Sequence, residues 1–76
     1  MTKAPTPEQI ADTLTARERV MLSCAALDID HVSAGITASA MQLMEVRGVI
    51  ERERGRYVLS DTGRAVFRAL LKRAGL

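Results

Sequence analysis

The sequence predicts a small α+β domain that is mostly helical and carries one two-stranded β-hairpin. Its 76 residues suffice for one domain, and 47% hydrophobic with 26% charged residues is typical of a globular chain. Helix-start signals recur along the chain, and strand-like segments flanking Arg54-Gly55 predict the hairpin. A chain of this size buries only about 60% of its unfolded surface, so a second copy would add stability.

The N-terminal segment, residues 1–14, is expected to form an arm or a short helix beside the main domain of residues 15–76. Thr6 and Gln9 have the spacing of a capping box, in which each side chain accepts a hydrogen bond from the other residue's backbone N–H. Pro7 suits the first helical position because its missing N–H would have no partner there.

A second capping box, Thr15 with Glu18, opens a helix predicted over residues 17–27. Its apolar side is expected to contain Val20, Met21, Cys24 and Leu27. Cys24 is expected to be a small buried apolar residue and not a nucleophile. A single cysteine excludes an internal disulfide and indicates a reducing compartment. No secretion signal or apolar run of about 20 residues is visible, so a cytoplasmic protein without a membrane partner is expected.

The next segment is expected to hold a short helical turn followed by a longer helix. Asp30 is placed to cap one turn over residues 31–34, and Gly35 then ends it. The longer helix is predicted over about 37–47, with Gly48 after it, where a left-handed conformation costs little. Its core side is expected to contain Ala40, Met41 and Met44, with Ile36 and Leu43 to one side.

Residues 49–53 and 56–59 have strand character on either side of Arg54-Gly55. A two-residue turn would place Glu53 opposite Arg56, Arg52 opposite Tyr57, and Ile50 opposite Leu59. Ile50, Tyr57 and Leu59 would then meet the core together. A type I′ turn needs positive φ at Arg54, so a slightly longer loop is the alternative.

The last predicted helix starts at Ser60 as N-cap, with Asp61 in the first turn, where a negative charge favours the helix dipole. Its apolar stripe contains Val66, Phe67, Leu70, Leu71 and Ala74. A second stripe is basic and contains Arg64, Arg68 and Lys72. Three interpretations of the basic stripe remain open: a solvated helix face, phosphate contact, or contact with an acidic protein.

Charge is spread unevenly along the chain. Residues 1–46 carry a net charge of −3 and residues 47–76 a net charge of +5. This polarity indicates that one face meets an anionic partner, with a merely solvated surface as the alternative. One histidine, one cysteine and five scattered glycines give no metal cluster and no phosphate-binding loop. No enzyme activity, metal or cofactor is therefore expected.

The order helix, short helix, turn, helix, hairpin, helix is that of a winged helix. The segments that carry the resemblance are MEVRGVIER at residues 44–52 and GRYVLSDTGR at residues 55–64. Over about residues 36–72 the chain resembles bacterial winged helix-turn-helix regulators of the MarR type and small phage regulators. In those proteins a glycine ends the recognition helix, an isoleucine enters the wing, and a Leu-Ser/Thr-x-x-Gly segment leaves it. Gly48, Ile50 and residues 59–63 are the counterparts here.

The resemblance implies sequence-specific binding of double-stranded DNA by a small bacterial or phage transcriptional regulator, acting as a homodimer on two half-sites. The helix at about 37–47 would enter the major groove, and an arginine-bearing wing would contact the backbone or the minor groove. The implied contact residues are Thr37, Ser39, Gln42, Val46 and Arg47 on the helix; Arg52, Arg54 and Arg56 on the wing; and His31 and Ser33 on the short turn.

An alternative function uses the same fold to bind protein, as an inhibitor of a host complex or as a subunit of a larger assembly. The outward face of the helix has no Lys or Arg before Arg47, although phosphate neutralisation dominates affinity for DNA. Leu43, expected in the core, could instead form a contact patch with Val46. DNA binding predicts a contiguous positive face that includes this helix, whereas protein binding predicts an apolar or acidic face with the arginines elsewhere.

Overall fold

Each helix begins at a hydroxyl residue that caps its first turn. The computed structural model describes residues 4–75 as an α+β, mostly helical domain. Its elements are α1 (Pro7–Thr13), α2 (Ala16–Leu27), α3 (Ala38–Val46), β1 (Ile50–Glu53), β2 (Arg56–Leu59) and α4 (Asp61–Arg73). The N-caps are Thr6, Thr15, Thr37 and Ser60, and both predicted capping boxes are present. The described elements therefore begin within about a residue of the sequence-based boundaries.

The segment between α2 and α3 contains the predicted helical turn. Residues 31–35 form hydrogen-bonded turns, and the Ala34 N–H donates to the Asp30 carbonyl at 3.3 Å, which is the bond of one α-helical turn. Asp30 takes the expected capping position, because its carboxylate accepts a hydrogen bond from the Val32 N–H at 3.2 Å. Gly35 then adopts φ +78°, which turns the chain before the helix can continue.

The hairpin has the predicted register. Ile50 pairs with Leu59, Arg52 with Tyr57, and Glu53 with Arg56. The turn has two residues, with φ +53° at Arg54 and φ +77° at Gly55, as a type I′ turn requires. The alternative of a longer loop is therefore wrong, although a residue with a side chain, such as Arg54, rarely adopts positive φ.

The core is aliphatic and sulfur-rich, as the shortage of aromatic residues demands. Its most deeply buried side chains are Leu22, Met41, Met44, Val49, Ile50 and Val66. Cys24 is buried as expected. The apolar side predicted for α2 is wrong in part, because Val20 and Leu27 are 45% and 62% exposed while Leu22 and Ala25 are buried. In α4, Val66 is buried and Phe67 and Leu70 pack against the core as predicted, whereas Ala69 is buried without having been predicted and Ala74, the C-cap, is exposed.

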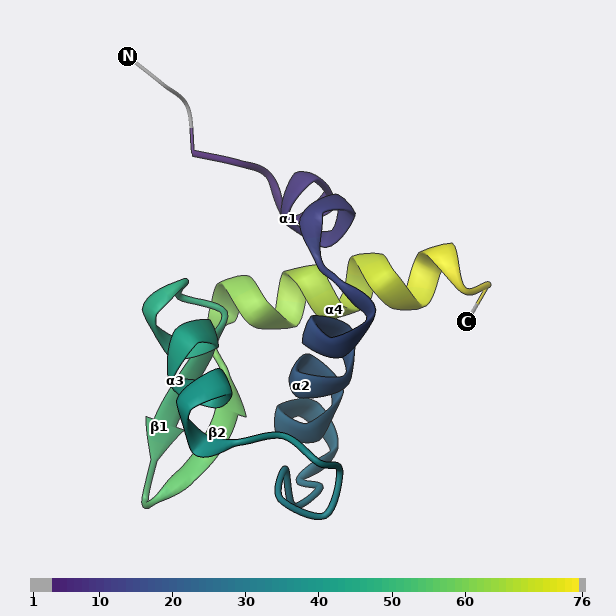
Figure 1. Cartoon of the computed structure of the whole chain (residues 1–76). Helices are drawn as coiled ribbons and strands as arrows, with labels where there is room; N and C mark the ends of the chain where they lie inside the picture. Colours follow the sequence, from purple (N-terminus) through teal and green to yellow (C-terminus); the bar gives the residue numbers. More distant parts are fainter. Residues whose placement is uncertain (1–3, 76) are drawn as a thin grey trace.

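The first and last helices pack against each other, and α3 packs beside the hairpin (Figure 1). Ala11 and Leu14 are buried in the common core, so the N-terminal helix docks on the rest of the chain. Arg73 near the end of α4 holds α1 through an ion pair with Asp12 at 2.7 Å and a hydrogen bond to the Glu8 carbonyl at 2.9 Å. The second half of α4 runs away from the hairpin, leaving α3 and the hairpin together at the other end of the molecule (Figure 1).

Candidate functional site

The exposed face of α3 is uncharged. Ala38, Ser39 and Gln42 are exposed, and the Thr37 hydroxyl accepts a hydrogen bond from the Ala40 N–H at 3.1 Å. Met41 and Met44 are buried, which confirms that they fill the core. Leu43 and Val46 lie outside, with 66% and 84% of their surface exposed. The expectation that Leu43 belongs to the core is therefore wrong.

Met44, Val49 and Ile50 are buried in the core where α3 meets the hairpin, and they anchor both elements there. Met41 and Met44 define the side of α3 that faces the core, and Leu43 lies outside that side. A nine-residue helix buries one stripe only, and sequence hydrophobicity alone does not show whether Leu43 belongs to it.

The hairpin presents its three arginines to solvent. Arg52 lies over the ring of Tyr57, 5.2 Å from its centre, and one guanidinium nitrogen donates to the Tyr57 hydroxyl at 3.3 Å. This contact follows from the register, which places the two residues opposite each other. Arg54 stands at the tip of the turn and forms no ion pair within residues 4–75.

Two of the other predicted site arginines are held by carboxylates. Arg56 on β2 forms an ion pair with Asp28, the residue that ends α2 in a left-handed conformation. Both side chains are largely exposed, so the pair is screened by solvent and contributes little to stability.

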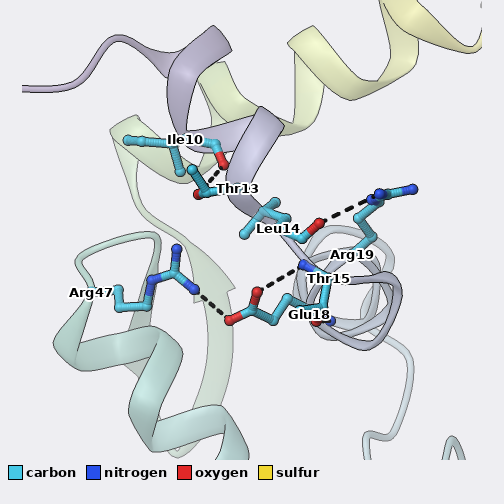
Figure 2. Close-up of polar contacts among 7 residues, drawn as sticks. All are labelled: Ile10, Thr13, Leu14, Thr15, Glu18, Arg19 and Arg47. Carbon is cyan, nitrogen blue, oxygen red and sulfur yellow. Dashed lines mark hydrogen bonds and ion pairs between the residues drawn. The ribbon is translucent and has the colours of Figure 1, made fainter.

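Arg47 follows α3 and forms an ion pair with Glu18 on α2 (Figure 2). The other carboxylate oxygen of Glu18 accepts a hydrogen bond from the Thr15 N–H at 2.8 Å, so one side chain serves both the cap of α2 and the end of α3. The hydrogen bonds around it are drawn in Figure 2. Arg47 is thereby directed toward α2 and away from the exposed face of α3.

The two site residues predicted on the short turn make local contacts. His31 Nδ1 lies 2.9 Å from the Ile36 carbonyl oxygen, and its ring meets the edge of Tyr57 with 5.5 Å between centroids. The Ser33 hydroxyl donates to the Asp30 carboxylate at 3.0 Å. His31 and Arg52 therefore both contact Tyr57, which joins the turn to the hairpin.

These segments, distant in sequence, meet at one edge of the molecule. A shallow cleft of about 530 Å³ is lined by residues of the turn, the start of α3 and the hairpin, among them Asp28, His31, Ala38, Arg52 and Arg56. We call this region, together with the exposed face of α3 and the hairpin tip, the α3–hairpin edge. Its electrostatic character is mixed, because Asp28, Asp30 and Glu53 lie among the arginines. Residues 38–46 hold no Lys or Arg, so the contiguous positive face that DNA binding predicts does not extend over α3.

The structure adds three residues that the sequence-based site omitted. Tyr57 connects His31 to Arg52, and Asp28 and Glu18 hold Arg56 and Arg47. The opposition of Arg52 and Tyr57 in the predicted register was a signal for the first contact. No local signal exists for the two ion pairs, because their partners are separated by 28 and 29 positions in the sequence.

The chain was compared with family models, curated proteins and solved structures, and none of them matches. No helix within residues 4–75 has the length and apolar character to cross a membrane. Nor does any group of three His, Cys, Asp or Glu side chains in that range gather as a metal site would require.

Proposed function

We propose that this protein is a small winged-helix protein that binds double-stranded DNA, with α3 as the recognition helix and the β1–β2 hairpin as the wing. The observation that carries the proposal is the α3–hairpin edge, where the start of α3, the turn at residues 31–35 and the arginine-bearing hairpin adjoin one another. These are the elements that the resemblance to winged-helix regulators assigns to DNA.

The major groove of DNA can admit a helix such as α3. The groove is about 12 Å wide, and an α-helix with its side chains is about 10 to 12 Å across. Small side chains at Ala38 and Ser39 allow the start of the helix to approach the bases closely. Arg52 and Arg54 are placed to contact phosphates or the minor groove beside it.

Fluorescence anisotropy with a labelled random duplex, at low salt and near physiological salt, tests the proposal. We expect salt-sensitive binding with a Kd of roughly 10⁻⁴ to 10⁻⁶ M near physiological salt. No binding at low salt would refute the assignment.

Two copies are expected on two half-sites one helical turn apart, and sedimentation velocity with and without a specific duplex would measure that stoichiometry.

Removing the charges of Arg52 and Arg54 should weaken DNA binding and flatten its salt dependence. Each lost phosphate contact lowers the slope of log K against log salt by about 0.9, so the double variant Arg52→Ala/Arg54→Ala should lower it by up to about 2. The matched control is Arg68→Ala/Lys72→Ala, which removes the same charge from two exposed positions of α4. An equal loss of slope in both variants would show that the hairpin has no special role.

Asp28→Asn should strengthen nonspecific DNA binding. The change releases Arg56 from its carboxylate partner and removes a negative charge from the α3–hairpin edge. Asn suits the left-handed conformation at residue 28, φ 56° and ψ 42°, so the end of α2 should persist. We expect the Kd for duplex DNA to fall severalfold at low salt, as measured by fluorescence anisotropy. The control is Asp12→Asn, a substitution in the α1–α4 contact. A Kd that does not change more than in the Asp12→Asn control would place Arg56 outside the interface.

A second candidate function is protein binding through the same α3 face. The observation that favours it is the exposure of Leu43 and Val46 on a face without charge, with the arginines on the adjacent hairpin. In this case the protein would act as an inhibitor of a host complex or as a subunit of an assembly. A protein that binds no duplex at low salt, but loses a co-purifying partner when Leu43 and Val46 become serine, would support this function.

A further inference from the structure

The exposed face of α3 offers few kinds of chemistry to a DNA groove. Its only side chains with hydrogen-bonding capacity directed outward are Ser39 and Gln42, since the Thr37 hydroxyl already serves the cap. Leu43 and Val46 supply exposed apolar surface. α3 contains no Lys or Arg, and its one carboxylate, Glu45, is half-buried.

On the basis of the proposed function, we propose that α3 recognises A·T base pairs, with Gln42 on adenine and Leu43 and Val46 on the methyl groups of thymine. An amide side chain pairs with adenine N6 and N7 through one acceptor and one donor, and the thymine methyl is the one apolar group in the major groove. Residues 39, 42, 43 and 46 recur at helical spacing, so their side chains lie along one face of α3.

G·C pairs find fewer partners on this face than A·T pairs do. The specific contact to guanine O6 and N7 comes from Arg or Lys, and the contact to cytosine N4 comes from a carboxylate. Arg47 is the cation nearest to α3 in sequence, and its guanidinium is engaged by Glu18 on α2. A G·C pair would therefore leave the polar edges of its bases against Leu43 and Val46, without hydrogen-bond partners.

The hairpin tip supports the same preference by a separate route. Arg54 projects from a tight type I′ turn and has no ion-pair partner within the described part of the chain. A-tracts have a narrow minor groove with strong negative potential, which attracts inserted arginine side chains. Both elements of the edge thus favour A·T sequences, one in each groove.

The test uses duplexes of equal length in which only one feature changes: an A·T-rich duplex, a G·C-rich duplex, and the A·T-rich duplex with every thymine replaced by deoxyuridine. Deoxyuridine removes the methyl group and leaves base pairing and the minor-groove edge unchanged. We expect about tenfold tighter binding to the A·T-rich duplex than to the G·C-rich one. The deoxyuridine duplex should bind several-fold more weakly than its thymine counterpart, because buried methyl contacts are lost.

The variant Leu43→Ser/Val46→Ser assigns the effect to α3. It should bind the thymine and deoxyuridine duplexes equally, while its salt dependence stays that of the wild type because no charge changes. Leu27→Ser/Val20→Ser is the matched control, since it removes exposed Leu and Val side chains from α2. This control should keep the deoxyuridine effect, and circular dichroism should show that both variants remain folded.

The outcomes separate this inference from the function on which it rests. No binding to any duplex at low salt would refute DNA binding itself. Salt-sensitive binding without A·T preference, or with an A·T preference that deoxyuridine leaves unchanged, would overturn the recognition by α3 and leave DNA binding standing.

Discussion

Gly63→Ala adds only one methyl group, yet it should strongly destabilise the protein. A Cβ at residue 63 would lie 1.9 Å from the carbonyl oxygen of Val49 and 2.9 Å from its carbonyl carbon. Both atoms belong to the backbone of Val49, which directly precedes β1, so no side-chain rotation relieves the clash. The first turn of α4 would have to separate from the hairpin, at a cost of about 3 kcal/mol, the upper end of the usual range for overpacking.

Chemical denaturation followed by circular dichroism measures this loss. A domain of this size has a total stability of roughly 4 to 11 kcal/mol, so a loss of about 3 kcal/mol would remove between roughly a quarter and three quarters of it. Gly48→Asn is the control, because Gly48 has φ +82° but open space around its Cβ position. Asn tolerates that conformation, so only a small loss is expected there. A Gly63→Ala variant as stable as Gly48→Asn would contradict the close approach of α4 to β1.

The second large effect is expected at Ser60, which joins the same two elements. Its hydroxyl donates to the Gly48 carbonyl at 2.6 Å and accepts from the Gly63 N–H at 2.9 Å. Ser60 is only 6% exposed, so Ser60→Ala would leave both groups without these partners in a site that water hardly reaches. We expect a loss of about 2 to 3 kcal/mol, more than for an ordinary N-cap.

Thr37→Ala provides the comparison, because Thr37 caps α3 through one hydrogen bond at an exposed position. Its loss should cost about 1 kcal/mol. The difference between the midpoints of urea denaturation of the two variants reports the value of the second hydrogen bond of Ser60. Equal midpoints would show that the contact between Ser60 and Gly48 contributes nothing to stability.

The parts of the fold that depend on near neighbours could be predicted from the sequence. A capping box needs two residues three positions apart, as in Thr15 and Glu18, and the side chains and backbone that complete it are local. The hairpin register follows in the same way from the length of the turn at Arg54-Gly55. These contacts form in the structure as expected.

The parts that depend on competition for the core could not be predicted in the same way. Leu22 and Leu27 have the same side chain on one helix, yet only Leu22 is buried, because the position of the hairpin and α4 decides which side of α2 is covered. The exposed position of Leu43 on α3 cannot be predicted from the sequence for the same reason. The resulting exposure of Leu43 is what gives the candidate site its apolar character.

The pairing of α1 with α4 has a consequence for biosynthesis. Ala11 and Leu14 of α1 lie in the same core as residues of α4. The last residue of α4, Arg73, is translated about sixty residues after them. Until α4 leaves the ribosome, the apolar side of α1 has no native surface to pack against. Completion of the core should therefore wait until α4 has been made, and nascent chains that end before α4 should be more sensitive to proteases than the finished domain.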